Sequence, residues 1–82
     1  MIRYALISRE GQRATYTYAV EGRSDDTGTV LVDLANDTID VTEQAPTDKA
    51  VGYPMYGFKM REALDTFKRS GDFKESGIVA WY

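Results

Sequence analysis

The chain has 82 residues, of which 43% are hydrophobic and 28% charged, and its formal net charge is −3. This length and composition indicate a single folded domain over residues 1–82 and exclude a disordered chain. Cys and His are both absent, so neither a zinc, haem or iron–sulfur site of the usual kinds nor a catalytic imidazole is expected, and we predict no cofactor and no metal.

The lack of cysteine also predicts the compartment. Small secreted domains usually compensate for a thin core with disulfides, which this sequence cannot form. The N-terminal residues contain no apolar stretch of signal-peptide length, and the longest apolar run, Ile78 to Tyr82, is far too short for a membrane span. We therefore expect a cytoplasmic protein without a membrane partner.

The first two strands are the clearest elements. Apolar residues alternate through Ile2–Ser8, and Arg13–Val20 places Ala14, Tyr16, Tyr18 and Val20 on one face. The intervening residues 9–12 include Gly11, which accepts a positive φ. Together these segments predict a β-hairpin.

A second hairpin follows the polar loop 21–28. Thr29–Leu34 and Thr38–Thr42 both alternate apolar and polar residues, and residues 35–37 are typical of a turn. The aspartates from Asp33 to Asp40 do not match a calcium loop, since Ala35 occupies the third position and no glycine follows. These aspartates are better explained as residues that form a turn.

One helix is predicted after a connecting loop over Gln44–Gly52, in which Pro46 blocks the strand ladder. Pro54 suits the first turn of a helix. Gly57 is a weak point inside the helix; either it allows close packing against the sheet, or the helix begins properly only after it. Gly71 suits the C-terminal cap. The apolar residues then follow helical spacing and predict one buried face: Tyr56, Met60, Ala63, Leu64 and Phe67.

The chain closes with a predicted loop over Asp72–Gly77, whose Phe73 turns back toward the helix, and a strand over Ile78–Tyr82. The complete pattern, β-β-β-β-α-β, predicts an α+β fold in which one helix packs on one face of an antiparallel sheet of about five strands. The helix returns the last strand beside the first, so the expected strand order is 5-1-2-3-4.

The aromatic residues leave two alternatives open. If Tyr16, Tyr18 and Trp81 face the helix, they are core residues, which is the favoured interpretation because aromatic side chains supply much of the burial in small domains. If they face away, they form an exposed aromatic patch. The Tyr53–Tyr56 segment either staples the helix start to the sheet or lines a groove. The candidate interaction surface therefore comprises Arg3, Arg13, Tyr16, Tyr18, Tyr53, Tyr56, Trp81 and Tyr82.

These features favour a non-catalytic protein-interaction or regulatory module over an enzyme. A homodimer is a natural form for it, because Ile78–Tyr82 is a candidate edge strand and edge strands pair readily with another chain. The alternative is a small-ligand or single-stranded nucleic-acid binder, with Tyr16 and Tyr18 stacking bases. Nucleic acid is the less favoured partner because residues 24–82 hold six basic and eleven acidic side chains, a balance of −5.

Truncation of one helix residue tests the predicted helix face. Leu64→Ala should lower the free energy of unfolding by about 2–5 kcal/mol, because a buried leucine leaves a cavity. Urea denaturation measures the loss. A loss below about 1 kcal/mol would show that the helix packs through a different face.

Overall fold

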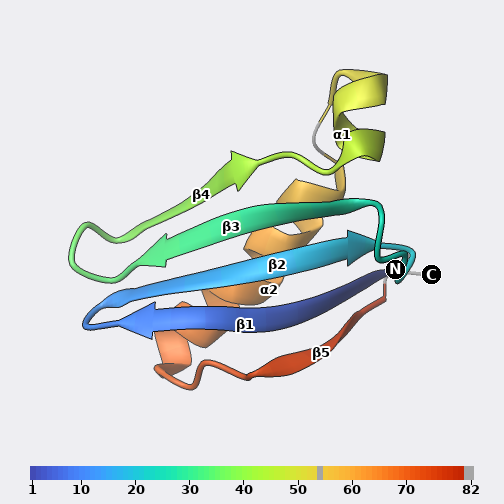
Figure 1. The fold of residues 1–82 in the computed structure, drawn as a ribbon. Coiled ribbons are helices and arrows are strands. Elements are labelled where there is room, and N and C mark those ends of the chain that lie inside the picture. The colour runs from blue at the N-terminus through green and yellow to red at the C-terminus, as the bar shows by residue number, and fades with distance from the viewer. Residues whose placement is uncertain (54, 81–82) are drawn as a thin grey trace.

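The computed structural model describes residues 1–53 and 55–80 and has an α+β fold (Figure 1). One five-stranded antiparallel sheet has the order β4-β3-β2-β1-β5, and the long helix α2 lies across one of its faces. Both the predicted fold and the predicted strand order are confirmed. The elements are β1 (Ile2–Glu10), β2 (Arg13–Val20), β3 (Thr27–Asp33), β4 (Thr38–Glu43), α1 (Pro46–Val51), α2 (Met55–Ser70) and β5 (Ser76–Val79).

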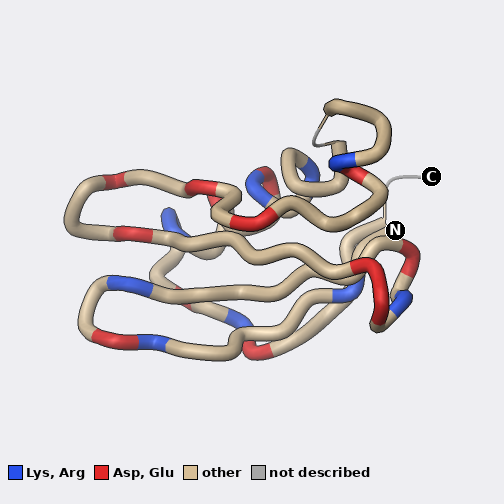
Figure 2. Tube along the Cα trace, turned by 45° about the horizontal axis from the view of Figure 1, so that its top comes forward, with Lys and Arg blue, Asp and Glu red and all other residues tan. Residues whose placement is uncertain are grey.

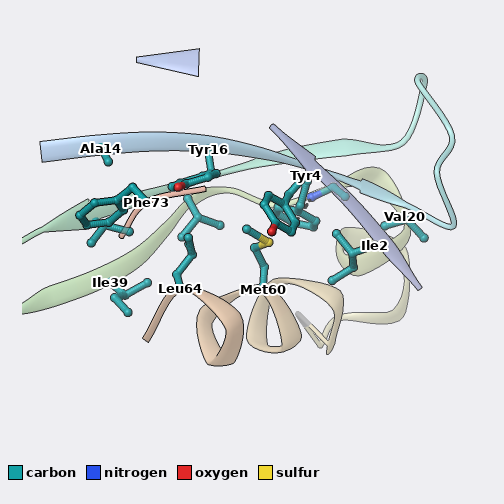
Figure 3. Packing of buried hydrophobic residues seen from close by; sticks show 13 residues of the cluster. Ile2, Tyr4, Ala14, Tyr16, Val20, Ile39, Met60, Leu64 and Phe73 are labelled. Atoms are coloured by element: carbon teal, nitrogen blue, oxygen red, sulfur yellow. Dashed lines mark hydrogen bonds between the residues drawn. The ribbon is translucent and has the colours of Figure 1, made fainter. Parts of the chain in front are cut away.

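The core lies between the sheet and α2. Met60 and Leu64 point from the helix toward the sheet, as Figure 3 shows, and both are fully buried. The ring of Tyr4 packs 5.9 Å from that of Tyr16 and 5.7 Å from that of Phe67. The predicted helix face is therefore confirmed, and β2 contributes its even-numbered residues to the core because side chains alternate along a strand.

Within residues 1–53 and 55–80, no helix covers the other face of the sheet. Most of its residues are alanine or threonine. The register places on it Arg3, Ala5, Thr15, Thr17, Ala19, Thr29 and Leu31. Such a sheet is solvated on one side, which is common for antiparallel sheets.

The expected loop over Gln44–Gly52 is wrong for most of its length, because Pro46–Val51 forms the short helix α1. Pro46 occupies the first turn of this helix, where its missing N–H costs nothing. The start of the helix is capped from a distant loop, since Asp26 accepts hydrogen bonds from the backbone N–H (2.9 Å) and the hydroxyl of Thr47. Gly52 ends the helix with a φ of 72°.

The last strand also differs from the prediction. It begins at Ser76, two residues earlier than expected, and pairs antiparallel with β1 from Ile2 to Ala5. Phe73 is buried as predicted, and the guanidinium of Arg9 lies 4.7 Å from the centre of its ring. The predicted continuation of the strand through Trp81 and Tyr82, like the helix-starting role of Pro54, falls on residues outside the described part of the chain.

Gly57 is buried where α2 lies against the sheet. A Cβ atom added there would lie 3.1 Å from Val41 Cγ2 and 3.3 Å from Tyr18 Oη. Glycine therefore avoids a tight contact at this position, which works against its intrinsic cost of about 1 kcal/mol in a helix. α2 begins at Met55, before Gly57, so close packing is the correct interpretation of this glycine.

The buried carboxylate of Asp48 holds α1, β2 and the start of α2 together. Its oxygens accept hydrogen bonds from Tyr18 Oη (2.9 Å), the Gly57 N–H (3.0 Å) and the Tyr56 N–H (3.1 Å). Tyr18 Oη in turn accepts from the Ala45 N–H at 3.0 Å. A carboxylate at the N-terminus of a helix satisfies amides that have no partner within the helix and interacts favourably with its dipole.

Replacement of this carboxylate should be costly. Asp48→Ala leaves a buried hydroxyl and two amides without an acceptor, and we expect a loss of about 3–5 kcal/mol in the free energy of unfolding. Urea denaturation of this variant, beside Asp25→Ala in an exposed loop, measures the difference; the control should change by less than about 0.5 kcal/mol. Equal, small losses in the two variants would show that Asp48 does not anchor α2.

Candidate interaction surfaces

Tyr16 and Tyr18 belong to the core. Neither side chain has any exposed surface, because β2 directs both toward α2. Tyr16 Oη donates to the Lys74 carbonyl at 2.7 Å, and Tyr18 Oη donates to Asp48. The favoured core interpretation describes the structure, and these two rings are not available to stack on nucleic-acid bases. The hypothesis that Tyr16 and Tyr18 stack on nucleic-acid bases is therefore wrong.

The two arginines lie at opposite ends of the first hairpin. Arg3 is exposed on the open sheet face, paired across the ladder with Ala19, whereas Arg13 pairs with Glu10 beside the turn. Arg13 Nε lies 3.4 Å from Asp33 Oδ2, so its charge already has a carboxylate partner. The structure does not bring these arginines together into one phosphate-binding surface.

The segment between α1 and α2 divides into an inner and an outer part. Tyr56 is half-buried and packs against the core, and its hydroxyl donates to Oε1 of Glu21, in the turn after β2, at 3.3 Å. Tyr53 is 57% exposed, and its ring packs edge-on against Phe58 at 5.4 Å. The predicted staple therefore fits Tyr56 and not Tyr53. Trp81 and Tyr82 lie outside the described residues.

In the part of the chain that the structure describes, both edges of the sheet present backbone groups without a neighbouring strand. In an antiparallel ladder, the N–H and C=O of successive residues point alternately to the two sides of a strand. The Leu34 N–H bonds to Gln12 O and the Val20 N–H to Asp26 O, so even-numbered residues of β3 face β2 and odd-numbered ones face β4. On β4, Asp40 is opposite Leu31 and faces inward, which leaves the backbone groups of Ile39 and Val41 directed outward.

The same argument fixes the other edge. The Leu6 N–H bonds to Glu75 O at 2.7 Å, so the even-numbered residues of β1 face β5. Tyr4 is opposite Gly77, and Gly77 therefore faces inward. The backbone groups of Ser76 and Ile78 point away from the sheet, and the Ile78 side chain, on the open face, is 58% exposed.

A groove separates each edge strand from α2. The groove beside β4 has a volume of about 460 Å³ and is lined by Ile39, Phe58, Arg61, Glu62 and Asp65. The groove beside β5 has a volume of about 330 Å³ and is lined mostly by apolar side chains, namely Tyr4, Ala63, Phe67, Ile78, Val79 and Ala80, together with Thr66. Each sheet edge thus combines free backbone groups with a place for side chains.

The two edges differ in charge. Figure 2 shows that charged residues gather at turns, loops and helices, and that much of the strand length is uncharged. Ser76–Val79 contains no charged residue, whereas β4 carries Asp40 and Glu43. Glu43 is paired with Lys49 at 2.7 Å, but Asp40 forms no ion pair within residues 1–53 and 55–80.

The other buried carboxylates are occupied by local structure. Burial raises the pKa of Asp26, but hydrogen bonds from Thr47 and Arg23 outweigh it and hold the pKa below its ordinary value. Asn36 donates to Asp33 and lowers its pKa, and Asp33 also accepts from the amide of Ala35 at 3.0 Å. These contacts stabilise loops and agree with the interpretation of Asp33 as a turn former.

Within the described ranges, the structure contains no group of three or more metal-ligating side chains, and neither of the two helices is long and apolar enough to span a bilayer. Comparisons with protein-family models, with curated proteins and with solved structures find no match.

The buried tyrosines predict a loss of stability in alkali. Burial raises the pKa of Tyr16 to about 12 from an ordinary value near 10, and it raises the pKa values of Tyr4 and Tyr18 as well. Above about pH 10 the unfolded chain releases protons that the folded chain retains, so the stability present below that pH is lost as the pH rises toward about 12.

Urea midpoints measured from neutral pH to about pH 11 test this linkage. Tyr16→Phe should be less stable at neutral pH, because the hydrogen bond to Lys74 is lost, but its midpoint should fall less steeply above about pH 10. Parallel curves for the two proteins would contradict the assignment.

Proposed function

We propose that the protein is a non-catalytic interaction module that forms a homodimer by extending its sheet through β5. The observation that carries the proposal is an uncharged edge strand, Ser76–Val79, with outward backbone groups and a highly exposed Ile78. Unpaired edges of this kind template pairing with another chain unless charge, proline or a covering element blocks them. Figure 1 shows no element beyond β5 among the described residues.

The sequence of β5 suits pairing with a second copy about a two-fold axis at Ile78. In this antiparallel register Ile78 lies opposite Ile78 of the second copy, and Gly77 lies opposite Val79. The two isoleucines meet on the open face, where they lose contact with water. No charged residue of Ser76–Val79 opposes another.

Gly77 accommodates Tyr4 on the helix side of this pair. A Cβ atom at Gly77 would lie 2.6 Å from Tyr4 Oη, so the hydroxyl of Tyr4 occupies the space of a side chain. Val79 of the second copy then reaches the groove beside β5, lined by Tyr4, Ala63 and Phe67. Apolar burial in that groove supplements the backbone hydrogen bonds between the edges.

The opposite edge is less suited to the same arrangement. A two-fold axis at Asp40 would place Asp40 directly opposite Asp40 of the second copy, and like charges in facing positions destabilise a strand pair. Symmetric dimers need a self-complementary surface. Of the two edges, β5 brings no like charges together in any register, whereas β4 must avoid the register centred on Asp40.

A dimer of this size is weak and reversible. Four residues from each edge bury much less than the roughly 1,200–2,000 Å² of a standard interface. The assembly should therefore depend on concentration, as expected of a regulatory module. The absence of His and Cys supports the non-catalytic part of the proposal, and the cytoplasmic location stays a prediction from composition.

Sedimentation over about 10 μM to 1 mM protein tests the dimer directly. The mass should rise toward that of two chains with concentration. Ile78→Asp should raise the dissociation constant at least about tenfold, because two carboxylates would face each other at the axis.

Ile7→Asp is the matched control, since Ile7 is 59% exposed but lies at an irregularity of β1 inside the sheet. This variant should dimerise like the parent. The proposal is contradicted if the protein remains monomeric at the highest concentration, or if Ile78→Asp and Ile7→Asp change the dissociation constant equally. Circular dichroism verifies that both variants are folded.

A further inference from the structure

We propose that the groove between β4 and α2 binds an extended segment of a partner protein in which apolar and basic residues alternate. This site is independent of the dimer edge, because β4 and β5 are at opposite sides of the sheet. The bound segment adds a sixth strand beside β4 and points its apolar side chains into the groove. Peptide recognition by strand addition combines backbone hydrogen bonds with pockets for alternate side chains.

The backbone of β4 supplies the hydrogen bonds. Ile39 and Val41 direct their N–H and C=O groups outward, as the ladder between β3 and β4 requires. α1 lies beyond the C-terminal end of β4, and Figure 1 shows no strand along the outer side of β4 in the described part of the chain. An extended segment matches this row of groups, whereas a helix does not, because its backbone groups bond internally.

The helix side of the groove accepts apolar side chains. A residue paired with Ile39 points its side chain to the same face of the sheet as Ile39, toward α2. There it meets Phe58, which is 38% exposed and packs against the ring of Tyr53. This apolar contact explains why large hydrophobic side chains remain exposed at the start of α2.

Charge selects the residues between the apolar ones. The side chain of Asp40 lies on the open face of β4 and has no ion-pair partner within the described ranges. A lysine or arginine of the bound segment directly opposite Asp40 would therefore form a favourable cross-strand pair. The carboxylates of the groove lining, Glu62 and Asp65, already face Lys59 (3.8 Å) and Arg69 (2.8 Å), so the charge preference of the site depends on Asp40. The balance of −5 over residues 24–82 attracts the same sign of partner over longer distances.

Two capped peptides of opposite charge test the proposal, one with alternating valine and lysine (GSVKVKVSG) and one with glutamate in place of lysine (GSVEVEVSG). Backbone amide NMR signals of the protein report the site, and fluorescence anisotropy reports the affinity. The basic peptide should shift the signals of Ile39 and Val41 and bind at least about threefold more tightly than the acidic one. Asp40→Lys should reverse this order, and Asp25→Lys, in an exposed loop, should not.

N-methylated peptides distinguish strand addition from contact through side chains alone. The bound segment is proposed to run antiparallel to β4, so that the valines opposite Ile39 and Val41 turn their amides toward the strand. Methyl groups on the valine amides should therefore abolish binding, whereas methyl groups on the lysine amides should leave it intact. The proposal is overturned by unshifted β4 signals with both peptides, by equal affinity of the two peptides, or by binding that ignores the valine methyl groups. It is also overturned if β4 signals shift with protein concentration alone, since a second copy would then occupy the groove. The Ile78→Asp variant serves as the protein in a repeat titration, so that failure of the dimer and failure of this site are separate results.

Discussion

The Asp48 carboxylate is the interaction on which the arrangement of the sheet edges depends. It is fully buried, and it connects the hydroxyl of a central strand residue, Tyr18, to the first amides of α2. α2 must therefore begin at one end of β2, where Gly57 allows its backbone to approach the sheet. From that anchor the helix crosses the middle of the sheet, and its own side chains Met60 and Leu64 are buried against the strands. A single helix in this position covers the centre and leaves both edge strands uncovered.

This placement leaves a small domain with the two edges on which both proposals rest. One helix cannot cover five strands, so a groove remains on each side of α2 between the helix and an edge strand. The edges share a geometry but differ in charge. In the proposed assemblies, the uncharged β5 pairs with a copy of itself, whereas Asp40 opposes pairing of β4 with itself about that residue and favours a basic partner. In this proposal Asp40 disfavours pairing of β4 with a second β4 and favours pairing with a basic segment.

Alternation and helical spacing were enough to predict the fold, the strand order and the buried face of α2, because residues such as Tyr16, Tyr18 and Leu64 follow strict periods. The sequence did not predict α1, since its cap comes from Asp26, twenty-one residues away. Nor did it identify Asp48, which resembles any aspartate of a polar loop until Tyr18 and Gly57 are brought to it. Pro46 and Gly52 are the local signals for α1, but a proline after a strand and a glycine in a polar segment are equally typical of a loop. The exposure of Phe58 and the outward direction of Ile39 are properties of the assembled sheet, and no local pattern encodes them.

The central claim, that the protein acts through two unpaired edges of defined direction, is tested most directly by hydrogen exchange of individual backbone amides in dilute solution. The account predicts alternation along each edge strand: fast exchange at Ile39, Val41 and Ile78, and slow exchange at their neighbours Asp40 and Gly77. Raising the protein concentration should then slow exchange at Ile78 and leave Ile39 unchanged. Uniform protection along both strands, or alternation with the opposite parity, would contradict it.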